Sequence, residues 1–439
     1  MLFLGYQSMQ VKDNKKIIRA WTFYDWANSV YPLVISSAIF PIFYEKITKN
    51  ELGGVVNIGG AEFINTAFYG YVVAISYLIV AVCSPVLSGV ADYSGNKKKF
   101  LQFFCYLGAC CASLLAFFST AHIAWSMLAL MLASTGYWGS LVFYNAYLPE
   151  IATPENHDKI SAKGFAMGYL GSSLLLILIL ILAVFTHIIP KIQYSFALVG
   201  LWWIGFSQIT LRRLPNGSKS TKSEGGIIGK GYRELRHVWQ ELKSHLHLRR
   251  FLASYFLYNM GVQTVMIMAV PFAAKAIAWE NEKQQQTSLI VSILLIQFLG
   301  IAGAFLMSSL SKKWGNIKTI GFVIFLWVVI CFSVYQFVYQ PMHFYIAAAA
   351  VGLVMGGIQA LSRSTYSKML PETTDHASYF SFYDVSEKIG LAIGTTTFGL
   401  IEDMTGGIRN SVLSLIVIFA LGFILLLRVP KIKSVLENA

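Results

Sequence analysis

Charged side chains are scarce in this chain: Asp, Glu, Lys and Arg make up 13% of its 439 residues. A soluble chain carries about a quarter of its residues charged. All five cysteines lie in apolar stretches, and none has metal-ligand spacing with histidine, so we expect neither a disulfide framework nor a metal site. A phosphate-binding Gly-Lys-Ser/Thr loop and a nucleophile–base constellation are also absent from the sequence. These absences argue against ATP hydrolysis, against an enzyme and against a cofactor.

Hydrophobic residues make up 56% of the chain, and the mean hydropathy is +0.59. They are arranged in long runs, and a run of about 20 apolar residues is enough to cross a bilayer as a helix. We count twelve such runs, at 17–44, 63–91, 99–120, 122–148, 162–188, 192–211, 250–278, 286–310, 317–339, 342–367, 377–402 and 408–429. The sequence therefore predicts an all-α membrane protein with twelve transmembrane helices.

The formal net charge of +13 could indicate a nucleic-acid partner, but the distribution of the basic residues argues otherwise. With twelve spans, both termini and every even-numbered loop lie on one side, and these regions hold 27 of the 34 Lys and Arg residues. Basic loops stay on the cytoplasmic side of a membrane. We therefore expect no nucleic acid, a multi-pass protein of a bacterial inner or plasma membrane, and both termini in the cytoplasm.

Repeated segments divide the chain into two halves. Tyr147-Leu148-Pro149-Glu150 ends the fourth run, and Met369-Leu370-Pro371-Glu372 ends the tenth. The polar interval between runs six and seven contains an amphipathic helix from Gly231 onward, with Leu235, Val238, Trp239, Leu242 and Leu246 on one face. Two pseudo-symmetric six-helix bundles with substrate between them are the major facilitator fold, which works by alternating access. The predicted parts are a tail (1–16), an N-terminal bundle (17–211), a cytoplasmic linker (212–249), a C-terminal bundle (250–429) and a tail (430–439).

The first run carries an acid well inside an apolar helix. Asp25, Asn28 and Ser29 are spaced so that they share one helix face, and Tyr24 adjoins them. An acid in a membrane helix is costly, and such acids usually face a polar cavity or a partner. We expect this face to bind a solute and Asp25 to be the first candidate for proton coupling.

The eleventh run carries three charges within one turn. Asp384 and Lys388 are four residues apart and can pair on one helix face, with Glu387 beside them. Two interpretations remain open. The pair could only pack the bundle as a neutral unit, or Lys388 could bind a substrate carboxylate while Asp384 or Glu387 takes up a proton.

Other polar residues in apolar runs are candidates for substrate binding or for hydrogen bonds between helices. Asn145 is in the fourth run, Asn259 and Gln263 are four apart in the seventh, and Gln359 precedes Arg363 in the tenth. Arg363 could hold a carboxylate or phosphate. It could equally extend to the interface or pair with Glu372.

The loop between the second and third runs, residues 88–99, resembles the loop signature of the major facilitator superfamily. In that signature glycines such as Gly89 and Gly95 allow close helix contact, and an acid such as Asp92 pairs with a neighbouring helix end to close a cytoplasmic gate. The corresponding second-half loop, 311–316, keeps its basic residues and Gly but lacks the acid. We therefore expect an asymmetric latch.

Six segments resemble signatures of the "unknown major facilitator" family, which includes the vacuolar amino-acid effluxers linked to autophagy. They are Tyr24-Asp25-Trp26-Ala27-Asn28-Ser29, Ala91-Asp92-Tyr93-Ser94-Gly95, the stretch Phe143 to Glu150, Tyr255-Phe256-Leu257-Tyr258-Asn259, Gly261-Val262-Gln263-Thr264 and Gln359-Ala360-Leu361-Ser362-Arg363. The resemblance implies a secondary transporter, with amino acids as the substrate class. An acid is expected after Asn259, but the chain has Met260 there, so a carboxylate partner for Asp25 is missing at that position.

We interpret the chain as a monomeric secondary transporter of a small polar solute, such as an amino acid or a small peptide-like molecule, with protons and the lipid bilayer as its other partners. A sugar, nucleoside or organic anion is the alternative solute. A receptor that binds ligand without flux, and a membrane enzyme acting on lipid, are the alternatives from other classes.

Overall fold

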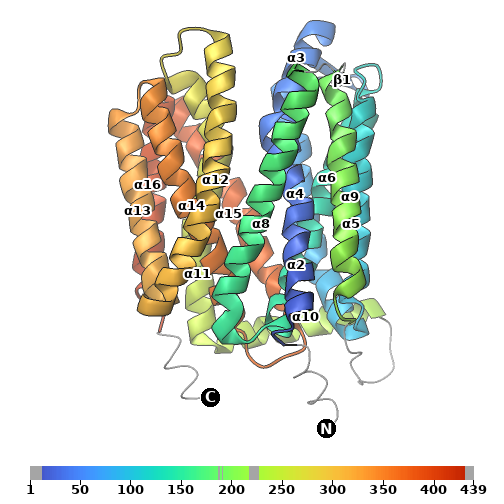
Figure 1. Ribbon diagram of the computed structural model, residues 1–439, viewed down its shortest axis with the longest axis vertical. Helices are drawn as coiled ribbons and strands as arrows, with labels where there is room; N and C mark the ends of the chain where they lie inside the picture. The colour runs from blue at the N-terminus through green and yellow to red at the C-terminus, as the bar shows by residue number, and fades with distance from the viewer. Residues whose placement is uncertain (1–11, 186–187, 190, 217–226, 431–439) are drawn as a thin grey trace. The chain divides into compact units, whose positions relative to one another are not determined.

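Helices form nearly all of the described chain. The computed structural model describes residues 12–185, 188–189, 191–216 and 227–430 (Figure 1). Most of the two predicted tails, 1–16 and 430–439, lies outside these ranges. The elements of the first half are α2 (Lys15–Asn28), η1 (Tyr31–Ala38), α3 (Phe40–Leu52), β1 (Val55–Ile58), β2 (Ala61–Ile64), α4 (Asn65–Ser94), α5 (Lys97–Leu114), η2 (Leu115–Phe117), α6 (Ile123–Asn145), α7 (Leu148–Ile151), η3 (Pro154–Asn156), α8 (His157–Leu180), η4 (Ile181–Phe185), η5 (Ile192–Tyr194) and α9 (Ser195–Arg213). Those that follow are α10 (Ile227–Ser244), α11 (Leu246–Ala276), α12 (Glu282–Trp314), α13 (Asn316–Phe337), α14 (Pro341–Met369), α15 (His376–Thr405) and α16 (Ile408–Leu426).

Eleven helical segments among the described residues are long and apolar enough to cross a membrane. The predicted span that is not among them, the eleventh run, is α15, which has 30 residues. At 1.5 Å per residue it is about 45 Å long, which exceeds the roughly 30 Å hydrocarbon core. Its composition sets it apart, because Asp384, Glu387 and Lys388 lie in its interior. The prediction of an all-α membrane protein is confirmed.

The first span is not one regular helix. It runs over Lys15–Leu52, beyond the predicted end near Tyr44, and α2 and α3 are separated by the π-helix η1. Pro32 and Pro41 lack the backbone N–H that a regular α-helix needs. In η1 the Ile39 N–H donates to the carbonyl of Val34, five residues earlier, at 2.9 Å. Asp25 thus lies in regular helix shortly before this change of pitch.

A β-hairpin follows the first span, where the sequence reading placed only a connection. β1 and β2 are antiparallel, with Val55 opposite Ile64. The turn residues Gly59 and Gly60 have φ of +60° and +90°. A two-residue hairpin turn of this kind requires positive φ at both positions, which glycine adopts without steric cost.

The contacts divide the described chain into two compact units. The first unit comprises residues 15–146 and 167–235, and the second comprises residues 12–14, 147–166 and 236–430. In the first unit α5 packs on α6 and α9, and α2 packs on α9. In the second unit α11 packs on α15 and α16, and α12 packs on α14.

The α12–α14 contact in the second unit depends on small residues. A Cβ atom at Gly356 would lie 2.0 Å from the carbonyl oxygen of Gly300. Only glycine allows backbones to approach so closely, and small residues at helix contacts are typical of membrane bundles. A side chain at Gly356 would therefore push the two helices apart.

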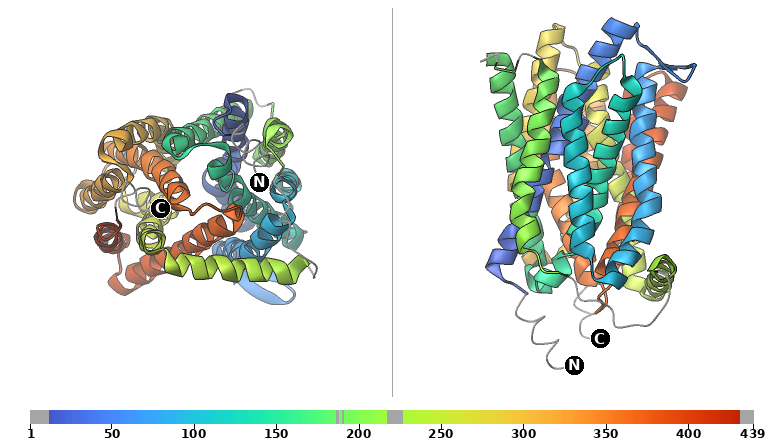
Figure 2. Two further views of the ribbon diagram at one scale, coloured as in Figure 1. Left: turned by 90° about the horizontal axis from the view of Figure 1, so that it is seen from below. Right: turned by 90° about the vertical axis from the view of Figure 1, so that its right-hand side faces the viewer.

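The predicted linker helix is present as α10. It lies roughly perpendicular to α11 and α15 rather than parallel to them (Figure 2). Val238 and Leu242 are buried, and the Trp239 ring lies 5.5 Å from that of Phe382. The end of α10 therefore packs against the second unit. Leu246, predicted to belong to its apolar face, instead begins α11 and is exposed.

Candidate functional site

Asp25 lies in α2 of the first unit, where its side chain is held by a phenol. Asp25 is 5% exposed, and its Oδ2 accepts a hydrogen bond of 2.7 Å from the Tyr144 hydroxyl of α6. The Trp21 ring stacks on Tyr144 with centroids 4.5 Å apart, and its Nε1 donates to the Tyr144 carbonyl at 3.0 Å. Stacking and hydrogen bonding therefore fix the phenol that faces the buried acid.

Asn28 and Ser29 continue the same face of the first span. Asn28 is fully buried, and its Oδ1 accepts a 3.4 Å hydrogen bond from the Ser29 hydroxyl. Its Nδ2 has no hydrogen-bond partner within the described part of the chain. Gly168 of α8 lies against Ser29, because a Cβ there would be 2.4 Å from the Ser29 hydroxyl oxygen. Tyr24, next to Asp25, is fully buried with its ring 4.9 Å from that of Tyr144.

Three of the charged residues of α15, Asp384, Glu387 and Lys388, form a compact cluster in the second unit. The Lys388 ammonium lies 3.0 Å from Asp384 Oδ1 and 3.6 Å from Glu387 Oε1. Lys388 is 2% exposed. The predicted Asp384–Lys388 pair is confirmed, and Glu387 makes it a group of three. One ammonium therefore faces two carboxylates at a site where the low dielectric makes any unpaired charge expensive.

Helix α11 supplies two hydrogen-bond donors to Glu387. The Tyr255 hydroxyl donates to Oε2 at 3.0 Å, and Gln263 Nε2 donates to Oε1 at 2.8 Å. Gln263 was a predicted site residue, whereas Tyr255 was only part of a motif without a role. The two are eight residues apart, a spacing that puts them on one helix face. That spacing is the signal that could have identified Tyr255.

Met260 occupies the position where the resemblance leads us to expect an acid. It lies where α11 meets α15: a Cβ at Gly394 would be 2.8 Å from Met260 Cγ, and one at Gly390 would be 3.4 Å from Met260 Cβ. The Asp384 and Glu387 carboxylates lie instead on α15, and Glu387 accepts hydrogen bonds from α11.

The remaining polar candidates differ in their surroundings. Asn259 is buried and its Nδ2 has no hydrogen-bond partner among the described residues. Gln359 and Asn145 are both partly buried, in α14 and at the end of α6 respectively. Their roles in substrate binding stay predictions.

Arg363 is buried in α14 and does not extend to the interface, so that expectation was wrong. It is 3% exposed, and its Nε and Nη2 donate to the hydroxyl and the carbonyl oxygen of Ser161, each at 2.9 Å. Its guanidinium also lies over the Phe165 ring, 4.1 Å from the centroid. Planar stacking together with several directed donors suits arginine at a buried position.

The loop that resembles the superfamily signature is compact in the first unit. Asp92 and Lys97, the first residue of α5, are both buried, and Lys97 Nζ lies 3.7 Å from Asp92 Oδ1. Gly95 ends α4 with φ of +66°, and Gly89 is buried within α4. The pairing of Asp92 with a helix end is present, and its gating role stays a prediction.

Asp158, a residue that sequence reasoning missed, organises the corresponding loop in the second unit. It is 3% exposed, at the start of α8. Its carboxylate accepts four hydrogen bonds: from Lys368 Nζ at 2.6 Å, Asn316 Nδ2 at 2.7 Å, Ser364 Oγ at 2.7 Å and Ser311 Oγ at 2.9 Å. The acid missing from the loop at 311–316 is thus supplied by α8. No local spacing signals this, because the partners are more than 150 residues away.

Residues 12–14 join the same unit through Asp13. Its carboxylate accepts a hydrogen bond from the Thr153 hydroxyl at 2.7 Å and another from the Thr153 N–H at 3.2 Å. Burial alone would raise the pKa of Asp13, but these hydrogen bonds outweigh it and hold the pKa below its ordinary value. The ionised acid thus anchors the start of the described chain to the segment at 147–166.

Comparison with known proteins identifies the family. The family described as "Vacuole effluxer Atg22 like" matches residues 13–439. The chain is 30% identical over 424 residues to the uncharacterized MFS-type transporter YxiO of Bacillus subtilis, covering 94% of this chain and 95% of that protein. It is 24% identical to autophagy-related protein 22 of Coccidioides immitis, covering 96% of this chain and 88% of that protein.

Solved structures share the fold at low sequence identity. The E. coli fucose:proton symporter FucP gives a TM-score of 0.65 at 14% identity, covering 95% of this chain and 98% of that one. The human organic anion transporter MFSD10 gives 0.67 at 12% identity, covering 94% and 98%. These likenesses confirm the major facilitator fold, and with the family match they confirm a transporter rather than an enzyme. The chain therefore belongs to the Atg22-like vacuole effluxer family, and it is a multi-pass membrane transporter of the major facilitator superfamily.

Proposed function

We propose that this transporter moves a small polar solute together with protons, and that amino acids are the first solute class to test. The observation that carries the proposal is the buried cluster on α15, in which Lys388 faces both Asp384 and Glu387. Membership in a family of effluxers supports transport.

The charge balance of the α15 cluster supports a bound proton. One ammonium neutralises one of the two carboxylates, and the other keeps its charge unless it takes up a proton. An unpaired charge in the centre of a membrane helix costs about 2.5–3.5 kcal/mol or more. Asp384 and Glu387 are both candidates to take up this proton, because the single Lys388 ammonium contacts both carboxylates. Protonation of Glu387 would leave the cluster neutral. A neutral cluster can pass between hydrated and dry surroundings at a lower free-energy cost than a charged one.

Asp25 is the candidate for proton coupling in the first unit. The Tyr144 hydroxyl stabilises its ionised form by donating to Oδ2. A proton on Asp25 would weaken that hydrogen bond and remove the buried charge. Asp25 and the α15 cluster therefore give each unit one group that can bind and release a proton.

The charges also suit a zwitterionic solute. An amino acid carries a carboxylate, which the Lys388 ammonium complements, and an ammonium group, which Asp25 complements. The amide nitrogens of Asn28 and Asn259, which have no partner within the described ranges, are further candidate hydrogen-bond donors. Tyr24, Asn145, Gln263, Gln359 and Arg363 complete the proposed set of solute-contacting or solute-positioning residues.

The positive-inside rule supports an orientation with both termini in the cytoplasm, because the basic residues concentrate in the loops on that side. A bacterial inner membrane is the location we propose. We also propose that the monomer is the working unit, with Asp92, Gly89 and Gly95 contributing to its cytoplasmic gate.

Uptake into proteoliposomes tests the proposal. Purified protein is reconstituted, and uptake of labelled amino acids is compared with and without an imposed pH gradient, with sugars, nucleosides and organic anions as parallel solutes. We expect the gradient to accelerate uptake of at least one amino acid. We expect Glu387→Gln to lose this acceleration while it still exchanges solute at equal pH, because the amide keeps the shape but cannot bind the proton.

Glu402→Gln is the matched control, since Glu402 lies on the same helix but pairs with the exposed Lys275 at 2.7 Å. This control should respond to the gradient like the unmodified protein. If the pH gradient still accelerates uptake fully in both Glu387→Gln and Asp25→Asn, neither acid is the proton-coupling group. Gradient-driven uptake of sugars or nucleosides alone would contradict the solute class, and ligand binding without any flux would favour a receptor.

A further inference from the structure

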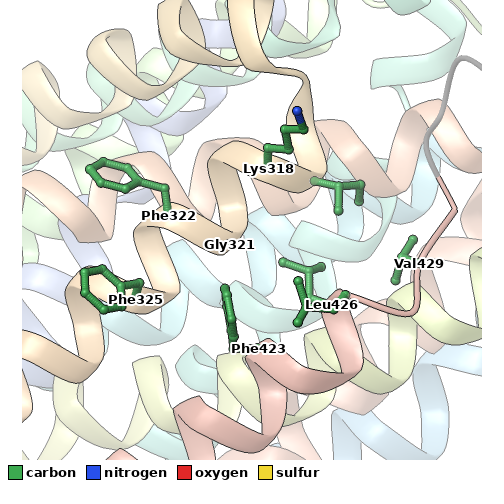
Figure 3. Close-up of a pocket in the computed structure, with 9 residues that line it drawn as sticks. Lys318, Gly321, Phe322, Phe325, Phe423, Leu426 and Val429 are labelled. Carbon is green, nitrogen blue, oxygen red and sulfur yellow. The ribbon is translucent and has the colours of Figure 1, made fainter.

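A groove opens between α13 and α16 in the second unit (Figure 3). Its volume is about 490 Å³, within the range of about 300–1,000 Å³ that is typical of small-molecule sites. The residues that line it are Ile317, Lys318, Gly321, Phe322, Phe325, Phe423, Leu426, Leu427 and Val429. All but Lys318 are apolar.

The wall of the groove is hydrocarbon and aromatic. Phe322, Phe325 and Leu427 are exposed outside the protein core. Both α13 and α16 are membrane spans, so exposed apolar side chains on them face lipid rather than water. Gly321 leaves the space between the helices, because a Cβ there would already contact Phe423 at 3.3 Å. The groove is therefore shaped to accept a flexible apolar chain.

One end of the groove is basic. Lys318 is exposed in the first turn of α13, and Lys312 and Lys313 are exposed at the end of α12. Arg428, just after the end of α16, lies between the lining residues Leu427 and Val429 and is exposed as well. None of the lining residues is acidic. Such a group of cations attracts an anionic headgroup at the membrane surface.

A tryptophan indicates where this basic end lies relative to the lipid headgroups. Trp314 is 49% exposed, and its ring packs edge-on against Phe322 with centroids 5.7 Å apart. Tryptophans are enriched at the level of the lipid headgroups, where one side of the ring is apolar and the other is hydrated. Lys318, one helical turn from Phe322, thus lies at headgroup level while Phe325 lies deeper in the span.

We propose that the α13–α16 groove binds an anionic phospholipid, with its phosphate at Lys318 and an acyl chain along Phe322, Phe325 and Phe423. Free phosphate does not fit the groove as well, because one exposed lysine supplies little affinity and the rest of the lining is apolar. A neutral phospholipid would fill the apolar part but would leave the basic end without a partner. The combination of one charged end and one apolar wall therefore favours an anionic lipid.

Native mass spectrometry of the full chain tests the proposal, with dioleoyl phosphatidylglycerol and dioleoyl phosphatidylcholine as probes. We expect phosphatidylglycerol adducts to dominate in the unmodified protein. Lys318→Glu should reduce the preference for phosphatidylglycerol over phosphatidylcholine by roughly fivefold or more, since each basic residue near an anionic surface contributes about that factor. Gly321→Phe should fill the groove and reduce tightly bound adducts of both lipids.

Gly205→Phe is the matched control for the glycine variant, because Gly205 is exposed on α9 and a Cβ there meets nothing within 4 Å. This control should keep the adducts of the unmodified protein. If Gly321→Phe fails to fold, Lys318→Glu still tests the proposal. Equal adducts of the two lipids, an unchanged preference in Lys318→Glu, displacement of phosphatidylglycerol by inorganic phosphate, or a protein dimer in place of lipid adducts would each overturn the proposal.

Discussion

Lys388 places an ammonium group between two carboxylates of its own helix, at a position that solvent barely reaches. Removing one member of a buried charged group leaves the others unpaired, whereas replacing a whole pair by apolar residues can be neutral. Glu387 has donors of its own in Tyr255 and Gln263. Asp384 has no other described partner at its Oδ2, so its charge depends on the lysine.

We predict that Lys388→Met destabilises the protein by about 3–5 kcal/mol, because it leaves the Asp384 carboxylate buried without its cation. The double variant Asp384→Leu/Lys388→Met should be closer to the unmodified protein than Lys388→Met alone. Thermal unfolding of the detergent-solubilised proteins ranks the stabilities of the unmodified protein, the single variants and the double variant. A double variant as unstable as the sum of its two single variants would show that the residues do not act as a pair.

The residue-scale predictions from sequence succeeded where the partners lie on one helix. The spacing of Asp384 and Lys388 predicts their contact directly. The hydrogen bonds of Tyr255 with Glu387 and of Ser161 with Arg363 depend on which helices pack together. Local spacing in the sequence carries no information about that packing. The expectation that Arg363 extends to the interface was wrong for that reason.

At the scale of helices and strands, hydropathy and proline positions account for most of what is seen. Apolar runs predicted the spans, but the π-helix after α2 depends on how the chain accommodates Pro32 and Pro41. The hairpin at 55–64 carried a signal that went unused, because Gly59-Gly60 between short apolar stretches is typical of a tight turn. The α11–α15 contact shows how glycine spacing controls the approach of two helices.

We predict that Gly394→Val destabilises the second unit by about 1–3 kcal/mol, the usual effect of overpacking. A Cβ at Gly394 would lie 2.1 Å from the Thr264 hydroxyl and 2.8 Å from Met260 Cγ. Gly399→Val on the same helix is the control, since a Cβ there has open space. Thermal unfolding compares the two, and equal effects would argue against close packing at Gly394.

At the scale of the whole chain, the second unit is assembled from segments far apart in sequence. Residues 147–166 belong to it although the chain on both sides belongs to the first unit. Repeats in the sequence predicted two halves, but not this grouping. The grouping follows from Asp158 and Arg363, whose partners are more than 150 residues away. Pairwise contacts of this kind lie beyond pattern-based reading of a single sequence.

We predict that Asp158→Asn loosens the contact between the start of α8 and the loop at 311–316, because Lys368 loses its carboxylate partner. Amide hydrogen exchange should become faster in both segments, and the loss of a buried charge pair corresponds to about 3–5 kcal/mol. Asp403→Asn, at an exposed position of α15, is the control. Unchanged exchange in Asp158→Asn would mean that other contacts hold these segments together.

The α15 cluster has two carboxylates and one ammonium, so the proposed transport cycle takes up one proton. This proton determines how the cycle responds to membrane voltage. A zwitterion is electrically neutral, so one accompanying proton would carry one positive charge across the bilayer with each molecule. Moving that charge through 100 mV changes the free energy by about 2.3 kcal/mol. Amino-acid uptake driven in this way should therefore follow an imposed potassium diffusion potential even at equal pH on both sides, whereas uptake of a monovalent anion with one proton should ignore it.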